Sequence, residues 1–279
     1  MNLKPESSEG NPDRRGFIKR TSGALTASLF VGSTASATPQ ATSTPESITH
    51  AGVQRELTER EKLARLASNT WPIRYIFKSR NNFLADQAEI ERMKKKYGEI
   101  TMLDFPEFTK KTFPGVYHMD LFSGLFGDMD DDSQYVKTVV VGYDGTSRTV
   151  TEFDPSSAAG KKWLEKMANK QVTTGTKCHH ISNNAPRDIC DLDAAKRKTG
   201  IAVAKKWLDG AAMLGAKSMR VNSGGPRIAP MPVADPSSYP KNGELAQYLA
   251  NCIESFKEMA DYGGKVGVKF TVVNILVLC

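Results

Sequence analysis

The sequence predicts an α/β fold in which about five parallel strands alternate with helices in a barrel-like sheet. Three observations support this prediction. Runs rich in β-formers alternate with segments of helical periodicity from about residue 70 onward. The apolar fraction of 39% and the charged fraction of 25% are ordinary for a globular protein. After removal of the predicted export segment, roughly 240 residues remain. That is enough for one α/β domain but short of the ~250 residues of a complete eight-unit barrel.

The first expected elements are a strand, a helix, a shorter helix and a strand. They lie at residues 73–77, 84–97, 106–113 and 116–121. The first helix stops at Gly98, because glycine is the residue type that most often follows the last helical residue. Gly115 leads into the second strand.

A hairpin and a helix are expected next. Two β-rich runs flank Asp144-Gly145, a dipeptide that favours a tight turn between antiparallel strands. These runs lie at residues 138–141 and 148–153. Asp154 fits the N-cap and Pro155 the first position of a helix that runs to about residue 169.

The remaining elements are expected to be three strands separated by two helices. They lie at residues 176–181, 192–214, 217–222, 242–264 and 268–278. In the expected helix at 192–214, apolar residues recur at spacings of three and four, at Ile201, Ala204, Leu208 and Ala212, which predicts one buried helix face. Gly215 ends that helix. The last helix opens at Asn242 and ends near Tyr262-Gly263-Gly264. Strands separated by helices indicate parallel βαβ units.

The N-terminal segment has the features of a twin-arginine export signal in the required order. Arg14 and Arg15 are followed by Phe17, Ile18 and Lys19, and then by an apolar stretch too short for a membrane-spanning helix of about 20 residues. An A-x-A cleavage site follows at 35–37. We expect residues 1–37 to be the signal peptide, 38–69 a flexible spacer and lead-in, and 70–279 the partial barrel. The expected location is periplasmic or extracellular, without stable membrane insertion.

Charge and cysteine patterns exclude some classes of function. The formal net charge is +7, but the positive residues are scattered, and residues 94–96 lie on a predicted helix among acidic residues. This pattern indicates a solvated helix face, so no nucleic-acid partner is expected. Cys178, Cys190, Cys252 and Cys279 show no paired metal-ligand spacing. Because twin-arginine substrates fold before export, we expect free thiols.

Four segments carry a resemblance to a known family. The strongest, residues 205–225, reads K-K-W-L-D-G-A-A-M-L-G-A-K-S-M-R-V-N-S-G-G, and the others are L-D-F-P-E-F (103–108), G-V-Y-H-M-D-L-F-S (115–123) and T-K-C-H-H-I (176–181). They resemble sugar phosphate isomerases/epimerases of the xylose-isomerase-like TIM-barrel superfamily, which also holds endonuclease IV-like enzymes and exported members. The resemblance covers most of residues 70–272.

The resemblance implies metal-assisted proton transfer on a sugar. A divalent metal, Mn²⁺ or Mg²⁺, would polarise a carbonyl and hydroxyl pair while carboxylates move the proton. The family's first metal-ligand Glu lies at the end of the fifth strand, where this chain reads K-F-T-V-V-N-I-L-V-L-C, with no carboxylate side chain after Asp261. We therefore expect an incomplete TIM (β/α) barrel with about five of the eight strands, C-terminally truncated, with no metal bound and no isomerase activity from this chain.

The substrate-binding candidates follow from the barrel architecture, in which ligands bind at the C-terminal ends of the strands. His179 and His180 end the third parallel strand, and Arg220, Asn222 and Ser223 end the fourth. Strand alternation would put the two histidines on opposite faces, so at most one of them would serve a pocket. The alternative is that one packs inside and the other is solvated. The glycines after Ser223 could present N–H groups to an anion or form a plain tight turn.

Weaker candidates lie earlier in the chain. His118 and Asp120 end the second strand. The acidic run D-M-D-D-D at residues 128–132 lacks the spacing of a calcium loop, so we expect a solvated loop there. No residue is assigned a catalytic role.

Two functions remain open. The first is a sugar phosphate isomerase/epimerase acting on a sugar or polyol with a divalent metal. The second is a non-catalytic half-barrel, either a pseudoenzyme or a piece that needs a partner chain. An endonuclease IV-like hydrolase would need metal ligands on the later strands, which are equally missing. Residues 270–278 contain no charge, Pro or Gly, so self-association through this strand is also expected.

Overall fold

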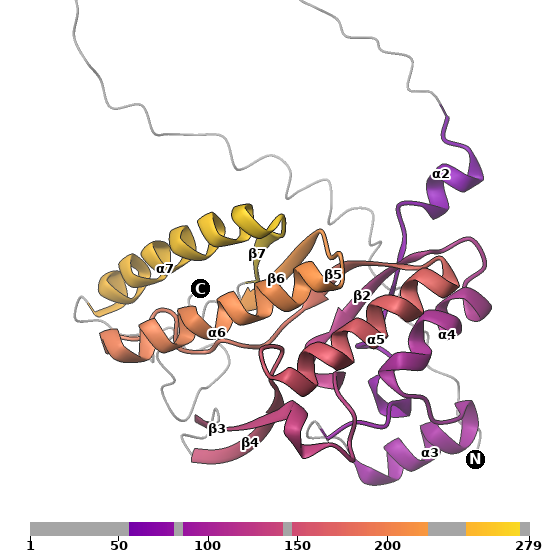
Figure 1. The fold of residues 1–279 in the computed structure, drawn as a ribbon, viewed down its shortest axis with the longest axis horizontal. Coiled ribbons are helices and arrows are strands. Elements are labelled where there is room, and N and C mark those ends of the chain that lie inside the picture. The colour runs from indigo at the N-terminus through magenta and orange to yellow at the C-terminus, as the bar shows by residue number, and fades with distance from the viewer. Residues whose placement is uncertain (1–55, 81–85, 142–146, 223–243, 274–279) are drawn as a thin grey trace, which may run out of the picture. The chain divides into compact units, whose positions relative to one another are not determined.

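The computed structural model describes residues 56–80, 86–141, 147–222 and 244–273. Five strands form one sheet in the order β1-β2-β5-β6-β7, and every neighbouring pair is parallel (Figure 1). They are β1 (Ala67–Asn69), β2 (His118–Phe122), β5 (Lys177–Ser182), β6 (Ser218–Asn222) and β7 (Lys269–Val273). The expected fold class, part of a (β/α) barrel with about five parallel strands, is confirmed.

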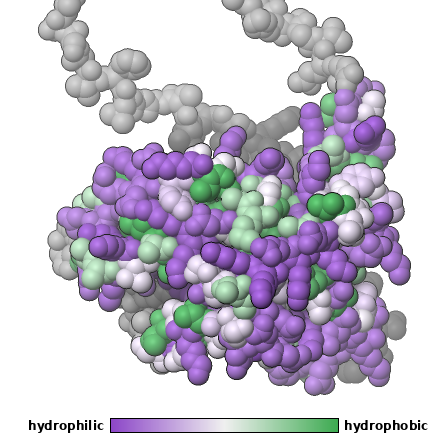
Figure 2. Space-filling model, in the orientation of Figure 1, coloured by the Kyte–Doolittle hydropathy of each residue, from purple (hydrophilic) through white to green (hydrophobic). Residues whose placement is uncertain are grey.

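Helices connect the successive strands of this sheet. They are α3 (Gln87–Tyr97), α4 (Phe105–Thr112), α5 (Ala158–Thr174), α6 (Ala194–Met213) and α7 (Glu244–Val266), preceded by the short α2 (Glu59–Leu63). Figure 1 shows α5 and α6 running alongside the strands, and Figure 2, in the same orientation, shows hydrophilic side chains prevailing over scattered apolar ones on this side of the molecule. Among the described helices, none has the length and apolar content to cross a membrane.

One face of the sheet forms the core with the helices. Alternate residues of β2 and β6 are buried there, because successive side chains of a strand point to opposite faces, whereas in β5 the two buried apolar residues are three positions apart. The buried residues on this face include Met119, Leu121, Cys178, Ile181, Met219 and Val221, and they share one apolar cluster with Leu164 and Met167 of α5, Leu208 of α6 and Met259 of α7. Burying each large apolar side chain contributes about 1.5–3 kcal/mol. The residues between them in β2 and β6, Asp120 and Arg220, therefore face the other side.

The expected hairpin is present, and an aromatic cluster attaches it to the core. Strands β3 (Tyr135–Val141) and β4 (Ser147–Phe153) pair antiparallel, and the intervening turn at 144–145 lies outside the described residues. Phe153 at the end of β4 lies 5.2 Å from Trp163 of α5 and 6.0 Å from Trp207 of α6, measured between ring centroids. Phe126 lies 5.1 Å from Trp163. These rings join the hairpin to two helices.

The first strand differs from the expectation. Residues 73–77 do not form a strand: Arg74–Ile76 is a 3₁₀ helix, with the Arg74 guanidinium 4.3 Å from the Trp71 ring. The sheet instead begins with Ala67–Asn69, inside the segment expected to be a lead-in. Its buried Ser68 shares a 2.8 Å hydrogen bond with Thr109 of α4. This tertiary contact, rather than β-propensity, explains the strand.

Two helix boundaries also differ. The N-cap of α5 is Ser157, whose hydroxyl accepts a bond from the Gly160 N–H, whereas Asp154 accepts from Ser156 one turn earlier. Helix α7 continues through Gly263-Gly264 to Val266. A Cβ on Gly263 would lie 2.5 Å from the Val268 carbonyl oxygen, so this glycine serves a close approach to the chain entering β7 rather than a helix end.

Candidate functional site

A layer of polar side chains covers the sheet face that the core does not use. Asp120 of β2 is paired in register with Asn69 of β1 on one side and His180 of β5 on the other. Ser182 and Arg220 are paired in the next row, on β5 and β6. The side chains of Asp120, His180 and Arg220 are half-buried. Four of the five strands, β1, β2, β5 and β6, thus contribute adjacent polar groups to one surface.

Hydrogen bonds fix the carboxylate of this layer. Asn69 Nδ2 donates to Asp120 Oδ2 over 3.0 Å, and Ser182 Oγ donates to Asp120 Oδ1 over 2.9 Å. On the far side of His180, its Nδ1 and the Ser218 hydroxyl are hydrogen-bonded at 2.8 Å. Each carboxylate oxygen keeps further acceptor capacity, because an ionised carboxylate has about four acceptor positions.

The charges of the layer influence each other. Burial lowers the pKa of His180 from its usual 6.5, the neighbouring Arg220 and His179 lower it further, and Asp120 acts in the opposite direction. The His180 ring is therefore neutral near neutral pH. Burial also lowers the pKa of Arg220, and Asp120 counteracts this. The guanidinium stays protonated, because arginine titrates far above neutral pH.

Amide groups border the layer beyond the ends of β5 and β6. Arg220 Nη2 donates to Asn184 Oδ1 over 2.8 Å, whereas the neighbouring Asn183 is fully buried on the core side, where its Nδ2 contacts Met219 Sδ at 3.9 Å. Asn222 Nδ2 donates to the Asn184 carbonyl over 3.5 Å, while its buried Oδ1 accepts no bond from the described residues. This border therefore offers donors and acceptors at the strand ends, where barrel ligands bind.

The structure brings together three of the five predicted binding residues. His180, Arg220 and Asn222 lie in the layer or on its border, and Ser223 lies outside the described residues. The register between β2 and β5 shifts after Met119, so β5 contains one extra residue, His179. This interrupts the strand alternation on which we based the opposite-face expectation. The exposed His179 ring lies 5.2 Å from the His118 ring.

Sequence reasoning ranked Asp120 too low and missed three further polar residues. Asp120 is the carboxylate of the layer, although it was only a weaker candidate. Asn69, Ser182 and Asn184 were not singled out. The available signal was the run S-N-N at the end of β5, because polar residues just past a barrel strand face the ligand side.

The described residues do not fit a divalent metal. No three His, Cys, Asp or Glu side chains converge within the described part of the chain. Asp120 and His180 lie next to the positive charge of Arg220, which would repel a cation. In the acidic run, Asp130 pairs with Lys78 at 3.2 Å and Asp132 pairs with Arg80, and both aspartates are largely exposed. That run is a solvated loop held by two basic residues.

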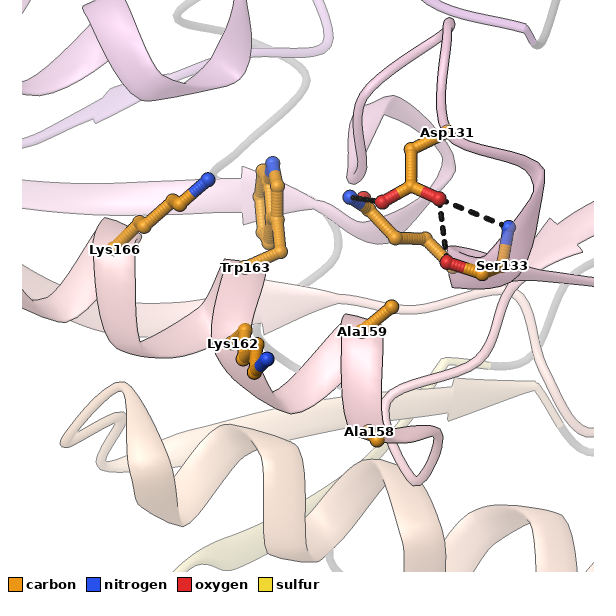
Figure 3. Close-up of a pocket in the computed structure, with 8 residues that line it drawn as sticks. Asp131, Ser133, Ala158, Ala159, Lys162, Trp163 and Lys166 are labelled. Carbon is orange, nitrogen blue, oxygen red and sulfur yellow. Dashed lines mark hydrogen bonds between the residues drawn. The ribbon is translucent and has the colours of Figure 1, made fainter.

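Two cavities lie elsewhere. One, of ≈ 480 Å³, lies between α5 and the loop before β3; Figure 3 shows Lys162, Trp163 and Lys166 on the helix and Asp131 opposite, bonded to Ser133. The other, of ≈ 610 Å³, lies between the hairpin and α6 and contains the Arg187–Glu152 ion pair, at 2.6 Å. Neither of these two cavities is lined by the polar layer.

The chain matches no protein-family model and no curated protein sequence. Among solved structures it is similar to the 3-keto-D-glucoside 4-epimerase of E. coli (15% identity over 39% of this chain and 40% of that one, TM-score 0.33). It is also similar to a D-psicose 3-epimerase solved with D-fructose (14% identity over 64% of this chain and 50% of that one, TM-score 0.40). A candidate sugar phosphate isomerase/epimerase of Anabaena variabilis matches at 12% over 75% of this chain and 53% of that one, with a TM-score of 0.40. The chain spans about half or less of the length of these structures.

Proposed function

We propose that the polar layer of the sheet binds a sugar or similar polyol, in a protein of the sugar phosphate isomerase/epimerase type. The observation that carries the proposal is the position of Asp120, bonded to Asn69 and Ser182 and flanked by His180 and Arg220. Sugar hydroxyls both donate and accept hydrogen bonds. A fixed carboxylate supplies the acceptor, and the guanidinium and amide groups supply donors.

The type of protein is supported by the sequence motifs at 103–108, 115–123, 176–181 and 205–225. Three of these motifs contain residues of the layer: Asp120 lies in the second, His180 in the third and Arg220 in the fourth. The low TM-scores of the solved structures add no support for a particular substrate. A ligand screen identifies the sugar.

We assign binding, rather than metal-assisted proton transfer, to the layer as described. Moving a proton between adjacent carbons requires a positioned base and stabilisation of the enediolate charge. The layer's one carboxylate, Asp120, is engaged with two donors, and Arg220 opposes a cation beside it.

A second candidate function is proton transfer on the bound sugar, and one observation favours it. The lowered pKa of His180 leaves a neutral imidazole in the layer near neutral pH, and a neutral imidazole can act as a general base. Incubation in D₂O with and without Mn²⁺ or Mg²⁺ separates the two functions. We expect no solvent deuterium in the recovered sugar; incorporation that His180→Gln abolishes would favour the second candidate.

The direct test is a ligand screen with the purified full chain. Aldoses, ketoses, polyols and their phosphates are titrated while the thermal midpoint and the amide NMR shifts are recorded. We expect at least one sugar or polyol to bind with a Kd between about 1 μM and 1 mM, and to shift the resonances of residues in β2, β5 and β6. Binding confined to the two cavities elsewhere, or no binding across the panel, would contradict the proposal.

We further propose that residues 1–37 direct export through the twin-arginine route, with the mature chain beginning at Thr38. The support is the order of features from Arg14 and Arg15 to the A-x-A site, all of which lie outside the described residues. N-terminal sequencing of exported material tests the cleavage site. Export that continues after both arginines are changed to lysine would contradict the route.

A further inference from the structure

Cys190 and Cys252 are buried together where α7 packs against the segment that precedes α6. Cys190 is 0% exposed and Cys252 is 3% exposed. Two hydrogen bonds hold the backbone on both sides of Cys190 to the same stretch of α7. Asn251 Nδ2 donates to the Asp191 carbonyl over 3.0 Å, and Ser255 Oγ donates to the Ile189 carbonyl over 2.5 Å.

The two thiols are in hydrogen-bond contact. This bond raises the pKa of Cys190, which burial raises further, and lowers the pKa of Cys252. The opposite directions are those expected when the Cys190 S–H donates to the Cys252 sulfur, because a donor stabilises the thiolate form of its acceptor. Cys252 is also the less buried of the two thiols, and we therefore take it as the one that meets the oxidant first.

We propose that Cys190 and Cys252 are a redox-active pair that forms a reversible disulfide on exposure to a peroxide. The Cys252 thiolate attacks one peroxide oxygen, the O–O bond breaks, and Cys252 becomes a sulfenic acid as the first water leaves. The Cys190 sulfur then attacks the Cys252 sulfur, the S–S bond forms, and the sulfenic oxygen leaves as the second water. The two thiols lose two hydrogens and two electrons, and hydrogen peroxide is reduced to two waters.

The surroundings of the pair favour this reaction over further oxidation. Closing the disulfide requires the sulfurs to approach to about 2.0 Å, and they already lie in contact within a packed interface. Because the resolving thiol is adjacent, a sulfenic acid on Cys252 is consumed before it meets more oxidant. Peroxide is small enough to reach the pair through a local opening of α7.

Cys178 provides an internal comparison. It is also buried, at 2% exposure, but its sulfur donates to the His180 carbonyl at 3.6 Å rather than to a thiol. The three described cysteines are free thiols in this structure, and the fourth, Cys279, lies outside the described residues. Among the three described cysteines, only Cys190 and Cys252 are predicted to change their thiol state as a unit.

Peptide mapping of the full chain tests the proposal. The native protein is treated with hydrogen peroxide, alkylated with iodoacetamide under denaturing conditions and digested with trypsin. Cys190 lies in the tryptic peptide 188–196 and Cys252 in 242–257, and neither peptide contains methionine. We expect these peptides to be recovered joined, with the mass of two hydrogens lost, and to be released by dithiothreitol. The oxidised protein should also have a thermal midpoint several degrees higher, reversed by the same reductant.

The controls separate this pair from non-specific oxidation. Cys178→Ser should leave the joined peptide at its native yield, whereas Cys190→Ser should abolish it and leave Cys252 as a sulfenic acid that dimedone labels. Should Cys190→Ser fail to fold, the native map still decides the question. Recovery of both native peptides singly alkylated after peroxide treatment, or joining of either one mainly to Cys178 or Cys279, would overturn the proposal.

Discussion

Asp120 of β2 lies opposite His180 of β5, and a register shift brings this pair together. Met119, the residue before Asp120, is paired with Cys178, so an uninterrupted register would have placed Asp120 opposite His179. The extra residue in β5 therefore selects which histidine accompanies the carboxylate. It also leaves His179 exposed beside His118. One irregularity in the sheet thus determines the composition of the polar layer.

Stability should depend on pH through His180. Its pKa in the folded chain is lowered from 6.5, so between the two values the unfolded chain binds a proton that the folded chain does not. The contribution of His180 to the free energy of unfolding is therefore present above pH 6.5, and it is lost as the pH falls through the pKa of His180 in the folded chain. Urea unfolding of the wild type from pH 8 to 5 should show a free energy of unfolding that decreases in this window.

Two variants locate that pH dependence. His180→Gln should flatten the decrease below pH 6.5, whereas His179→Gln should retain most of it, because His179 makes the smallest of the contributions to the pKa shift of His180. Carboxylates with a lowered pKa, such as Asp131 and Asp154, change the free energy of unfolding only at more acidic pH. Equal slopes in the wild type and in His180→Gln would show that His180 does not titrate as described.

The aromatic cluster should contribute much of the free energy that holds the hairpin against the core. Phe126 is 2% exposed and lies near Trp163, Trp207 and Phe153. Phe126→Ala should lower the free energy of unfolding by about 3–5 kcal/mol, because truncating a buried aromatic ring leaves a cavity. Phe113→Ala, at a ring that is 41% exposed, should cost about 1 kcal/mol or less. Urea denaturation followed by tryptophan fluorescence measures both, and similar losses would argue against the cluster.

Self-association should proceed through β7. In the described sheet β7 pairs with β6 only, and its Val272 is 44% exposed. An unpaired strand edge with apolar side chains is a template for another strand, and a lysine on it opposes such pairing. Val272→Lys should therefore reduce oligomers in light scattering at matched protein concentration.

The matched control for this edge is Val172→Lys. Val172 is 80% exposed but lies on helix α5, which presents no strand edge. That variant should scatter as the wild type does. A monodisperse wild-type monomer, or an equal effect of both substitutions, would contradict association through β7.

The strands that carry a clear local sequence pattern were predicted from the sequence. The β-rich runs at 176–181 and 217–222 are flanked by amphipathic helices, and both strands appear within one or two residues of expectation. The strand Ala67–Asn69 has no β-branched or aromatic residue, so only its pairing with β2 reveals it. Conversely, the β-rich residues 73–77 form a 3₁₀ turn against Trp71.

The candidate site was only partly predictable for a similar reason. The strand-end rule finds His180, Arg220 and Asn222, because it depends only on where each strand stops. The role of Asp120 depends on cross-strand register, and a single extra residue in β5 changes that register without a sequence signal. The contact between Cys190 and Cys252 joins segments far apart in the chain, so no local spacing indicates it.

The most direct test of the polar layer as a binding site is calorimetric titration of the wild type and Asp120→Asn with the sugar selected by the screen. The substitution keeps the side-chain shape but removes the charge, so the contribution of each hydrogen bond to this group falls from about 1.5–3 kcal/mol to about 0.5–1.5 kcal/mol. Asp261→Asn, at an exposed position on α7, is the control for charge alone. We expect Asp120→Asn to weaken binding at least about tenfold while Asp261→Asn binds as the wild type does. Unchanged affinity in a folded Asp120→Asn protein would contradict the assignment.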